Sequence, residues 1–318
     1  MVADDAQNWT RPIGWYQEKT DYVRVLFERA GGGPNSVLGM LAAGLQRGVR
    51  DYHAMMREVV ETAMAALPKA GIRVDRNGHM NGKELARWSS DFANQSWWSR
   101  HFGTRAELLT VSTPDATQCS KPVGSMKLDR AQLMKLVLIA RDDRGVPVLT
   151  KGGFVFEHTL NKPPIVIGGK SLAEIVGAAY EHSEVITMVD ARWEWDNGPL
   201  AEYIDTFSER VFGYKKSRKN RTTMPRHMGG DKIMDEEPMQ WMAKTATDGE
   251  RPVVLKDGVI EWFEHTHQIA YMVSLYEAVR DARRILKLDN VAQALKDNFG
   301  PRYYGEMLDA IDDIEAMR

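Results

Sequence analysis

The sequence predicts a mainly α-helical fold, arranged as an elongated or two-lobed array of helices with long loops. Apolar residues recur at spacings of three and four through much of the 318-residue chain, which is typical of amphipathic helices. Gly, Pro and Asn residues separate these segments, as expected where helices end. No internal repeat of fixed period accompanies them.

Residues 1–112 are expected to form an N-terminal helical region. Tyr22, Val25 and Leu26 begin a short helix, which the run Gly31–Pro34 ends. Asn35 or Ser36 then caps a helix of about 30 residues, because one apolar face persists until Pro68 stops it. A further helix is predicted after the turn-rich residues 71–82 from a set of large apolar side chains: Leu85, Trp88, Phe92, Trp97 and Trp98.

Residues 113–125 are expected to be a linker, and residues 126–213 a middle helical region. Pro114 and Pro122 mark the linker as a loop. In the middle region, an apolar face predicts one helix from Leu128 to Asp142. Ser171 and Glu174 have the spacing of a capping box and predict the start of another helix. Helical spacing predicts a further one over residues 199–213.

Residues 214–256 form a connector of mixed basic and acidic charge with little periodicity, which we expect to wrap the surface or to be poorly ordered. Residues 257–318 are expected to hold three helices in succession. Asp289 or Asn290 caps the second of them, and Gly300 and Pro301 separate it from the third. The last apolar stripe should pack against another part of this protein or of a longer polypeptide.

Composition limits the classes of partner. The formal net charge is -2, so the chain as a whole has no electrostatic attraction to nucleic acid or to an anionic membrane. No apolar run approaches the roughly 20 residues of a membrane span. The single cysteine, Cys119, excludes an intrachain disulfide and a cysteine-built zinc site.

Two short motifs resemble ligand sites but fail on spacing. Residues 165–171 end like a phosphate-binding loop, yet Pro164 stands where that loop needs a glycine. His265 and His267 suggest a zinc site, but residues two apart on a helix point about 200° apart and do not share one ion. We therefore predict no cofactor and no metal.

One segment has a strong local excess of positive charge. It is a candidate for contact with phosphates of nucleic acid, although acidic residues from Asp231 to Glu237 can offset it and a solvated loop is the simpler interpretation. Its basic residues are Lys215, Lys216, Arg218, Lys219 and Arg221.

Three stretches follow one another in a particular order from residue 126 onward. The first is Leu128–Ala140, followed by a Gly-Gly turn and by helices that end in Phe207–Gly213. The second is Thr222–His227, which stands in place of an aromatic-proline turn. The third runs from His267 through residues 282–286 and 298–304 to the closing helix. This order resembles the helical connecting regions of large bacteriophage internal virion proteins, also called polyvalent or ejection-type proteins.

The resemblance implies a non-enzymatic structural or interaction segment that packs with itself or with other virion proteins. It also implies a place in the virion interior or the host cytoplasm, and possible contact with DNA. No catalytic residue carries over from the resemblance. The alternative is a hydrolase or toxin-like enzyme domain whose site is built from a His/Glu set: Glu157, His158, His265 and His267.

Overall fold

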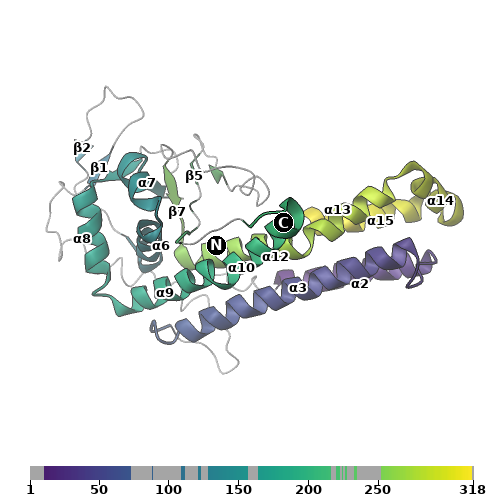
Figure 1. The fold of residues 1–318 in the computed structure, drawn as a ribbon, viewed down its shortest axis with the longest axis horizontal. Coiled ribbons are helices and arrows are strands. Elements are labelled where there is room, and N and C mark those ends of the chain that lie inside the picture. Colours follow the sequence, from purple (N-terminus) through teal and green to yellow (C-terminus); the bar gives the residue numbers. More distant parts are fainter. Residues whose placement is uncertain are drawn as a thin grey trace. The chain divides into compact units, whose positions relative to one another are not determined.

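The computed structural model confirms the mainly α-helical fold (Figure 1). It describes residues 11–72, 88, 109–111, 121–122, 128–156, 164–215, 220–222, 224, 226–227, 233–234 and 252–316. The chain divides into two compact units. The first unit includes Glu61–His265, and the second combines Gln7–Val60 with Thr266–Arg318. The predicted linker at residues 113–125 lies mostly outside the described residues and stays a prediction.

The second unit begins with α2 (Arg11–Arg29), which starts well before the short helix predicted from Tyr22. It is followed by α3 (Val37–Ala66), which has the predicted length of 30 residues. Ser36 caps α3 as predicted, because its Oγ accepts a hydrogen bond from the backbone N–H of Gly39 at 3.0 Å. The first part of α3, up to Val60, belongs to this unit.

The C-terminal segment contains four helices where three were predicted: α12 (Gly258–Ser274), α13 (Tyr276–Leu286), α14 (Asp289–Phe299) and α15 (Pro301–Ala316). Leu275 interrupts the helical segment between α12 and α13. Helical hydrogen bonds continue across this break, from Leu275 N–H to Tyr271 O and from Val279 N–H to Leu275 O. The apolar stripe therefore runs through both α12 and α13, and the sequence pattern did not indicate that they are separate helices. Gly300, with φ +88°, and Pro301 separate α14 from α15 as predicted.

Packing in the second unit centres on α15, which lies against α2, α13 and α14. Its buried side chains Met307, Ile311 and Ile314 belong to the core of the unit. The helix α3 approaches the α12–α13 junction through Gly48, where a Cβ would lie 2.6 Å from the backbone O of Ser274. A glycine is therefore required at this contact.

The first unit contains α6 (Arg130–Arg141), α7 (Gly145–Lys151), α8 (Gly169–Ala179), α9 (Ser183–Asn197) and α10 (Pro199–Phe212). The helix α6 contacts α7, α8 and α9, and its residues 133–139 are all buried. A capping box starts it: Asp129 Oδ1 accepts from Gln132 N–H, and Gln132 Oε1 accepts from Asp129 N–H. The core of this unit is therefore built around α6.

The capping box predicted at Ser171 is wrong. The helix α8 begins at Gly169, with Gly168 as its N-cap, so Ser171 already lies in the first turn. Glycine supplies no side-chain oxygen for capping, and the extended conformation of Gly168 starts the helix instead. The two glycines before Lys170 and Ser171 thus mark the helix start more accurately than the serine.

Short strands add a small sheet to the first unit. They are β1 (Leu109–Val111), β2 (Lys121–Pro122), β3 (Phe154–Phe156), β4 (Ile165–Ile167), β5 (Arg226–His227), β6 (Ile233–Met234) and β7 (Val253–Leu255). Among the described residues their order is β2-β1-β4-β3-β7-β5-β6, with β3 and β7 parallel. All three residues of β7 are buried. The expectation that residues 214–256 lie on the surface or are poorly ordered is therefore wrong at this end.

In the part of the chain that the structure describes, no helix combines the length and the hydropathy needed to cross a membrane.

Candidate functional site

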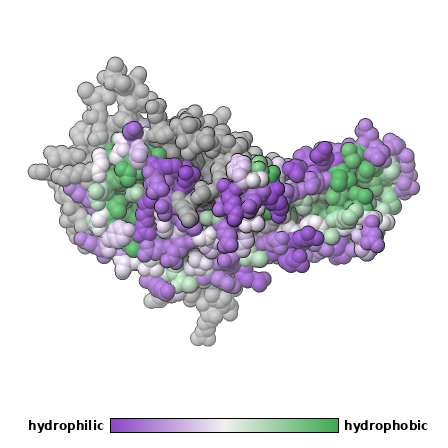
Figure 2. Space-filling model, viewed as in Figure 1, coloured by the Kyte–Doolittle hydropathy of each residue, from purple (hydrophilic) through white to green (hydrophobic). Residues whose placement is uncertain are grey.

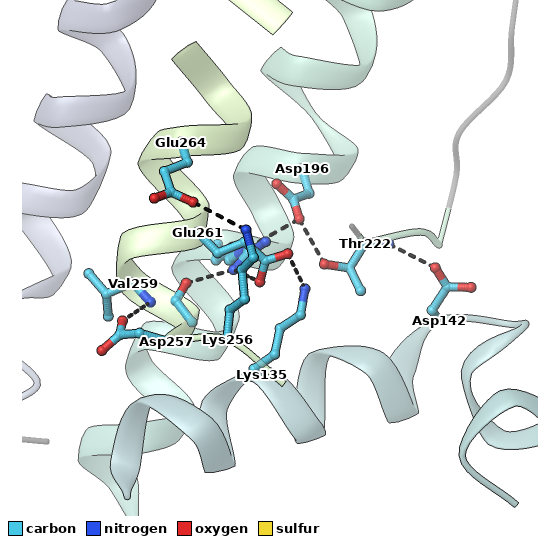
Figure 3. A network of polar contacts seen from close by, with 11 residues as sticks. Lys135, Asp142, Asp196, Thr222, Lys256, Asp257, Val259, Glu261 and Glu264 are labelled. Carbon is cyan, nitrogen blue, oxygen red and sulfur yellow. Dashed lines mark hydrogen bonds and ion pairs between the residues drawn. The ribbon is translucent and has the colours of Figure 1, made fainter. Parts of the chain in front are cut away.

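A cluster of buried charged side chains joins three helices of the first unit (Figure 3). Lys135 of α6 donates a hydrogen bond from Nζ to Oε1 of Glu261 in α12, at 2.7 Å. Arg192 of α9 approaches the same carboxylate, with Nη1 3.5 Å from Oε2 of Glu261. All three side chains are almost wholly excluded from solvent. One carboxylate therefore links α6, α9 and α12 inside the unit.

A second carboxylate balances the charge of this cluster. Asp196 of α9 has its Oδ2 3.5 Å from Nε of Arg192, one helical turn away. Burial lowers the pKa of Lys135 to about 8, while the neighbouring Glu261 opposes this shift. Lys135 therefore stays mainly protonated at neutral pH. Lys135, Arg192, Glu261 and Asp196 thus form a cluster of two cations and two carboxylates, in which removal of one partner would leave a buried charge uncompensated.

The start of α12 is fixed against α6, which places Glu261 beside Lys135. At Gly258, a Cβ would lie 2.7 Å from the backbone O of Ala131. Asp257 caps α12 by accepting hydrogen bonds from the backbone N–H groups of Val259 and Ile260, each at 2.9 Å. Burial raises the pKa of Asp257 to about 6.

The charged cluster also holds a short piece of the polar connector. Thr222 donates from Oγ1 to Asp196 Oδ2 at 3.0 Å, and its backbone N–H donates to Asp142 Oδ2 at 2.8 Å (Figure 3). The backbone N–H of Arg221 donates to Oδ1 of Asn197 at 2.9 Å. Asp142 follows the last residue of α6, and Asn197 is the last residue of α9. Residues 221 and 222 are therefore anchored at the C-terminal ends of two helices.

The basic segment predicted to contact nucleic acid lies between this anchor and the end of α10. Lys215 is exposed and has its Nζ 3.7 Å from Oε2 of Glu209, which is exposed as well. Lys216, Arg218 and Lys219 lie outside the described residues. Arg221 is half-buried and held through its backbone, as above. The structure thus describes both ends of the segment, and contact of its side chains with nucleic acid stays a prediction.

The His/Glu set of the enzymatic alternative is described only in part. Glu157 and His158 lie outside the described residues, so their approach to the other two is untested. His265 and His267 are both half-buried and lie two positions apart on α12, where helical geometry directs them to different sides.

His267 lies against Tyr52 of α3 in the second unit. Their ring centroids are 5.6 Å apart in an edge-on arrangement. Burial lowers the pKa of His267 to about 4, so this imidazole is neutral at pH 7. Within the described ranges, no three His, Cys, Asp or Glu side chains are grouped as metal ligands. His267 thus serves the packing of α12 on α3.

Sequence reasoning missed the charged cluster because its members lie far apart along the chain. Lys135 and Glu261 are separated by 126 positions, and no local pattern connects them. A signal was nevertheless present in α6, where Lys135 is the only charged residue in the apolar run from Leu133 to Ile139. A lone charge at a core position requires a buried counter-charge.

Comparison with known proteins gave no match to a family model, to a curated protein or to a solved structure.

Proposed function

We propose that this protein is a non-enzymatic helical component that packs with copies of itself, as a segment of a phage internal virion protein of the ejection type. The virion role comes from the resemblance in the order of its segments. The observation that carries the packing role is an apolar stripe on α14 that is only partly covered. The enzymatic alternative depends on Glu157 and His158, which lie outside the described residues, so it stays untested.

The stripe on α14 runs the length of the helix. Leu288, just before α14, and Phe299, its last residue, are eleven positions apart, or about three turns, so they lie on one side. Leu295 lies between them and is buried, whereas Leu288 and Phe299 are 47% and 41% exposed. We call Leu288, Leu295 and Phe299 the α14 stripe. Large exposed apolar side chains in line are typical of a surface that another protein covers.

Other apolar side chains of the second unit are exposed as well, and Phe299 has an aromatic neighbour. The ring of Phe299 lies 5.8 Å from that of Tyr303, whose hydroxyl donates to the backbone O of Leu26 near the end of α2. Val37 and Met40, at the start of α3, are 51% and 58% exposed. Figure 2 shows hydrophobic side chains gathered at this end of the unit. Exposed apolar side chains of the second unit are therefore found on α3 as well as beside α14.

A second copy of the chain fits the charges along the α14 stripe. Asp289 lies at the N-terminal end of α14, and Lys296 lies two turns later and is also exposed. In a two-fold pair of antiparallel α14 helices, Asp289 of each copy lies beside Lys296 of the other. Two-fold symmetry is the commonest arrangement of homo-oligomers and makes such a contact twice. Self-association therefore uses both the apolar stripe and its charged rim.

Co-purification of two differently tagged copies, expressed together, tests this packing. Wild-type copies should be recovered together when either tag is captured. Leu288→Asp combined with Phe299→Asp should abolish recovery, because burial of an unpaired carboxylate at the contact is unfavourable. The matched control is Val146→Asp in the first unit, where the valine is similarly exposed at 45%. Equal recovery for all three proteins, or none for the wild type, would reject the proposal.

The virion role needs a separate measurement. Particles purified from a phage whose genome encodes this chain should contain it at several copies per particle, detected by quantitative mass spectrometry. They should retain it after treatment with protease, because an internal protein is shielded by the capsid. Its presence only in the lysate, or its loss on protease treatment, would contradict an internal virion location while leaving self-association intact.

A further inference from the structure

A row of exposed arginines lies along α3 in the second unit. Arg47, Arg50 and Arg57 are all exposed. At about 100° per residue, they lie within a sector of about 80° on one side of the helix and span about 15 Å along its axis. Val49 and Tyr52, on the side away from them, are buried. The row therefore faces solvent on a helix whose other side belongs to the core.

The neighbouring helix α13 adds two exposed cations. The two helices approach each other at Gly44, where a Cβ would lie 3.9 Å from Cβ of Ala278. Arg284, in the last turn of α13, and Lys287, its C-cap, are exposed, whereas Ala282 on the other side is buried. In both helices the cations thus lie away from the buried side chains. We call these five residues the α3–α13 basic surface: Arg47, Arg50, Arg57, Arg284 and Lys287.

The charge of this surface is not balanced within the part of the chain that the structure describes. None of its five side chains lies within ion-pair distance of a described carboxylate. Asp51 is the only acidic residue between Arg47 and Arg57 in the sequence. Other cations of the same unit are paired with carboxylates: Lys19 with Asp313, Arg24 with Glu28, and Arg302 with Glu306. The surface therefore has a local excess of positive charge that the chain as a whole lacks.

The chemistry of the surface selects a polymer of phosphates. Guanidinium groups match phosphate oxygens with two parallel hydrogen bonds. Duplex DNA carries one negative charge per about 1.7 Å of its axis, so a straight row of cations can follow its backbone. Tyr52 is the only Phe, Tyr or Trp of α3 and is buried, so the row offers no ring on which an unpaired base can stack. A duplex therefore fits the surface better than a single strand.

We propose that the α3–α13 basic surface binds the phosphate backbone of duplex DNA without regard to base sequence. Contacts to phosphates hold a protein on the duplex but carry no sequence information. The inference goes beyond self-association and uses none of the residues of the α14 stripe.

Fluorescence anisotropy with a labelled DNA duplex of mixed sequence and the full-length chain tests the inference. The logarithm of the affinity should fall by about 0.9 per log unit of salt for each phosphate contacted. Replacing Arg47, Arg50 and Arg57 together by Gln should weaken binding by at least about tenfold at low salt and reduce this slope. Replacing the same three residues by Lys should retain the slope, because Lys keeps the charge, and this variant guards against a loss caused by misfolding.

The matched control removes the same number of charges from the same unit. It combines Lys19→Gln, Arg24→Gln and Arg302→Gln, whose cations are paired with carboxylates. This variant has the same net charge as the Gln variant of the arginine row, but its affinity and slope should stay close to those of the wild type. Arg284→Gln combined with Lys287→Gln should weaken binding, because α13 contributes to the surface. Light scattering of each variant separates a change in self-association from a change in binding.

Three results would overturn the inference. The first is the absence of binding to the duplex at low salt. The second is an equal loss of affinity for the two variants with three Gln substitutions, which would show that net charge alone governs binding. The third is an affinity for poly-glutamate or for single-stranded DNA that equals the affinity for the duplex. That result would assign the surface to an acidic protein or to polyanions in general.

Discussion

Glu261 is the residue on which the buried charges of the first unit converge, since it contacts both Lys135 and Arg192. Replacing it by Leu leaves two buried cations with one remaining carboxylate, Asp196. We expect this change to lower the free energy of unfolding by about 3–5 kcal/mol. Lys135→Met should cost less, because Arg192 remains as a partner for Glu261. Urea unfolding followed by circular dichroism measures both values.

The double variant with Lys135→Met and Glu261→Leu should recover much of the loss, because it removes opposite charges together. Glu306→Ala serves as the control, since its partner Arg302 is 94% exposed and such a pair contributes about 0–1 kcal/mol. Equal losses for Glu261→Leu and Glu306→Ala would refute the structural importance assigned to the buried cluster.

His267 gives the second unit a dependence on pH. Burial lowers its pKa in the folded protein to about 4, against 6.5 in the unfolded chain. Between these values the unfolded chain binds more protons, so the free energy of unfolding falls as the pH is lowered from 6.5 to 4. The loss amounts to at most about 3 kcal/mol. His267→Gln, which does not titrate, should remove this part of the pH dependence.

The comparison must be made between variants, because Asp257 acts in the opposite direction. Its pKa is raised to about 6, so protonation of Asp257 favours the folded state as the pH falls through the same range. His53→Gln is the matched control, since His53 is the neighbour of Tyr52 in sequence. Chemical denaturation at several pH values is the measurement. If the free energy of unfolding of His267→Gln changed with pH in parallel with that of the wild type, the pKa of His267 would be the same in the folded and unfolded states. That result would contradict the burial of this imidazole.

At the scale of elements, replacing either of two glycines on one face of α3 by Ala is expected to change the free energy of unfolding in opposite directions. A Cβ at Gly48 would lie 2.6 Å from the backbone O of Ser274, whereas at Gly44 the nearest atom, Cβ of Ala278, is 3.9 Å away. Gly48→Ala should therefore lower the free energy of unfolding by about 1–3 kcal/mol. Gly44→Ala should raise it by about 0.5–1 kcal/mol, because alanine favours the helix.

Thermal unfolding of Gly48→Ala, Gly44→Ala and the wild type measures both predicted changes in stability. The two substitutions are identical in chemistry and lie one turn apart, so a general effect of alanine on α3 would change both in the same direction. Stabilisation by both would contradict the close approach between Gly48 and the α12–α13 junction.

The sequence predicted elements well where one apolar face meets one clear stop. The helix α3 is such a case, since Ser36 caps it and Pro68 follows its end. The helix α9 was not singled out, because Arg192 and Asp196 are buried among its apolar residues and obscure the periodicity. Strands of two or three residues are too short for any alternation to be recognised.

The candidate surfaces were predictable to different degrees. The basic residues from Lys215 to Arg221 are visible in the sequence as a charge run. The anchor at Thr222 depends on Asp142 and Asp196, which lie 80 and 26 positions away in the chain. Contacts of this range are set by the tertiary fold, and no local pattern encodes them.

At the scale of the whole molecule, association must arise from local surfaces, because a net charge of -2 gives the 318 residues little overall attraction to any partner. The α14 stripe is such a surface, and it suits a second copy of the chain.

The most direct test of this account is the molar mass of the wild-type chain, measured by light scattering over a wide range of protein concentration. Self-association through the α14 stripe predicts a mass that rises from 36.0 kDa towards twice that value, and that stays at the lower value when Leu288 and Phe299 are both replaced by Asp. A mass of 36.0 kDa at every concentration for the wild type would contradict the central claim.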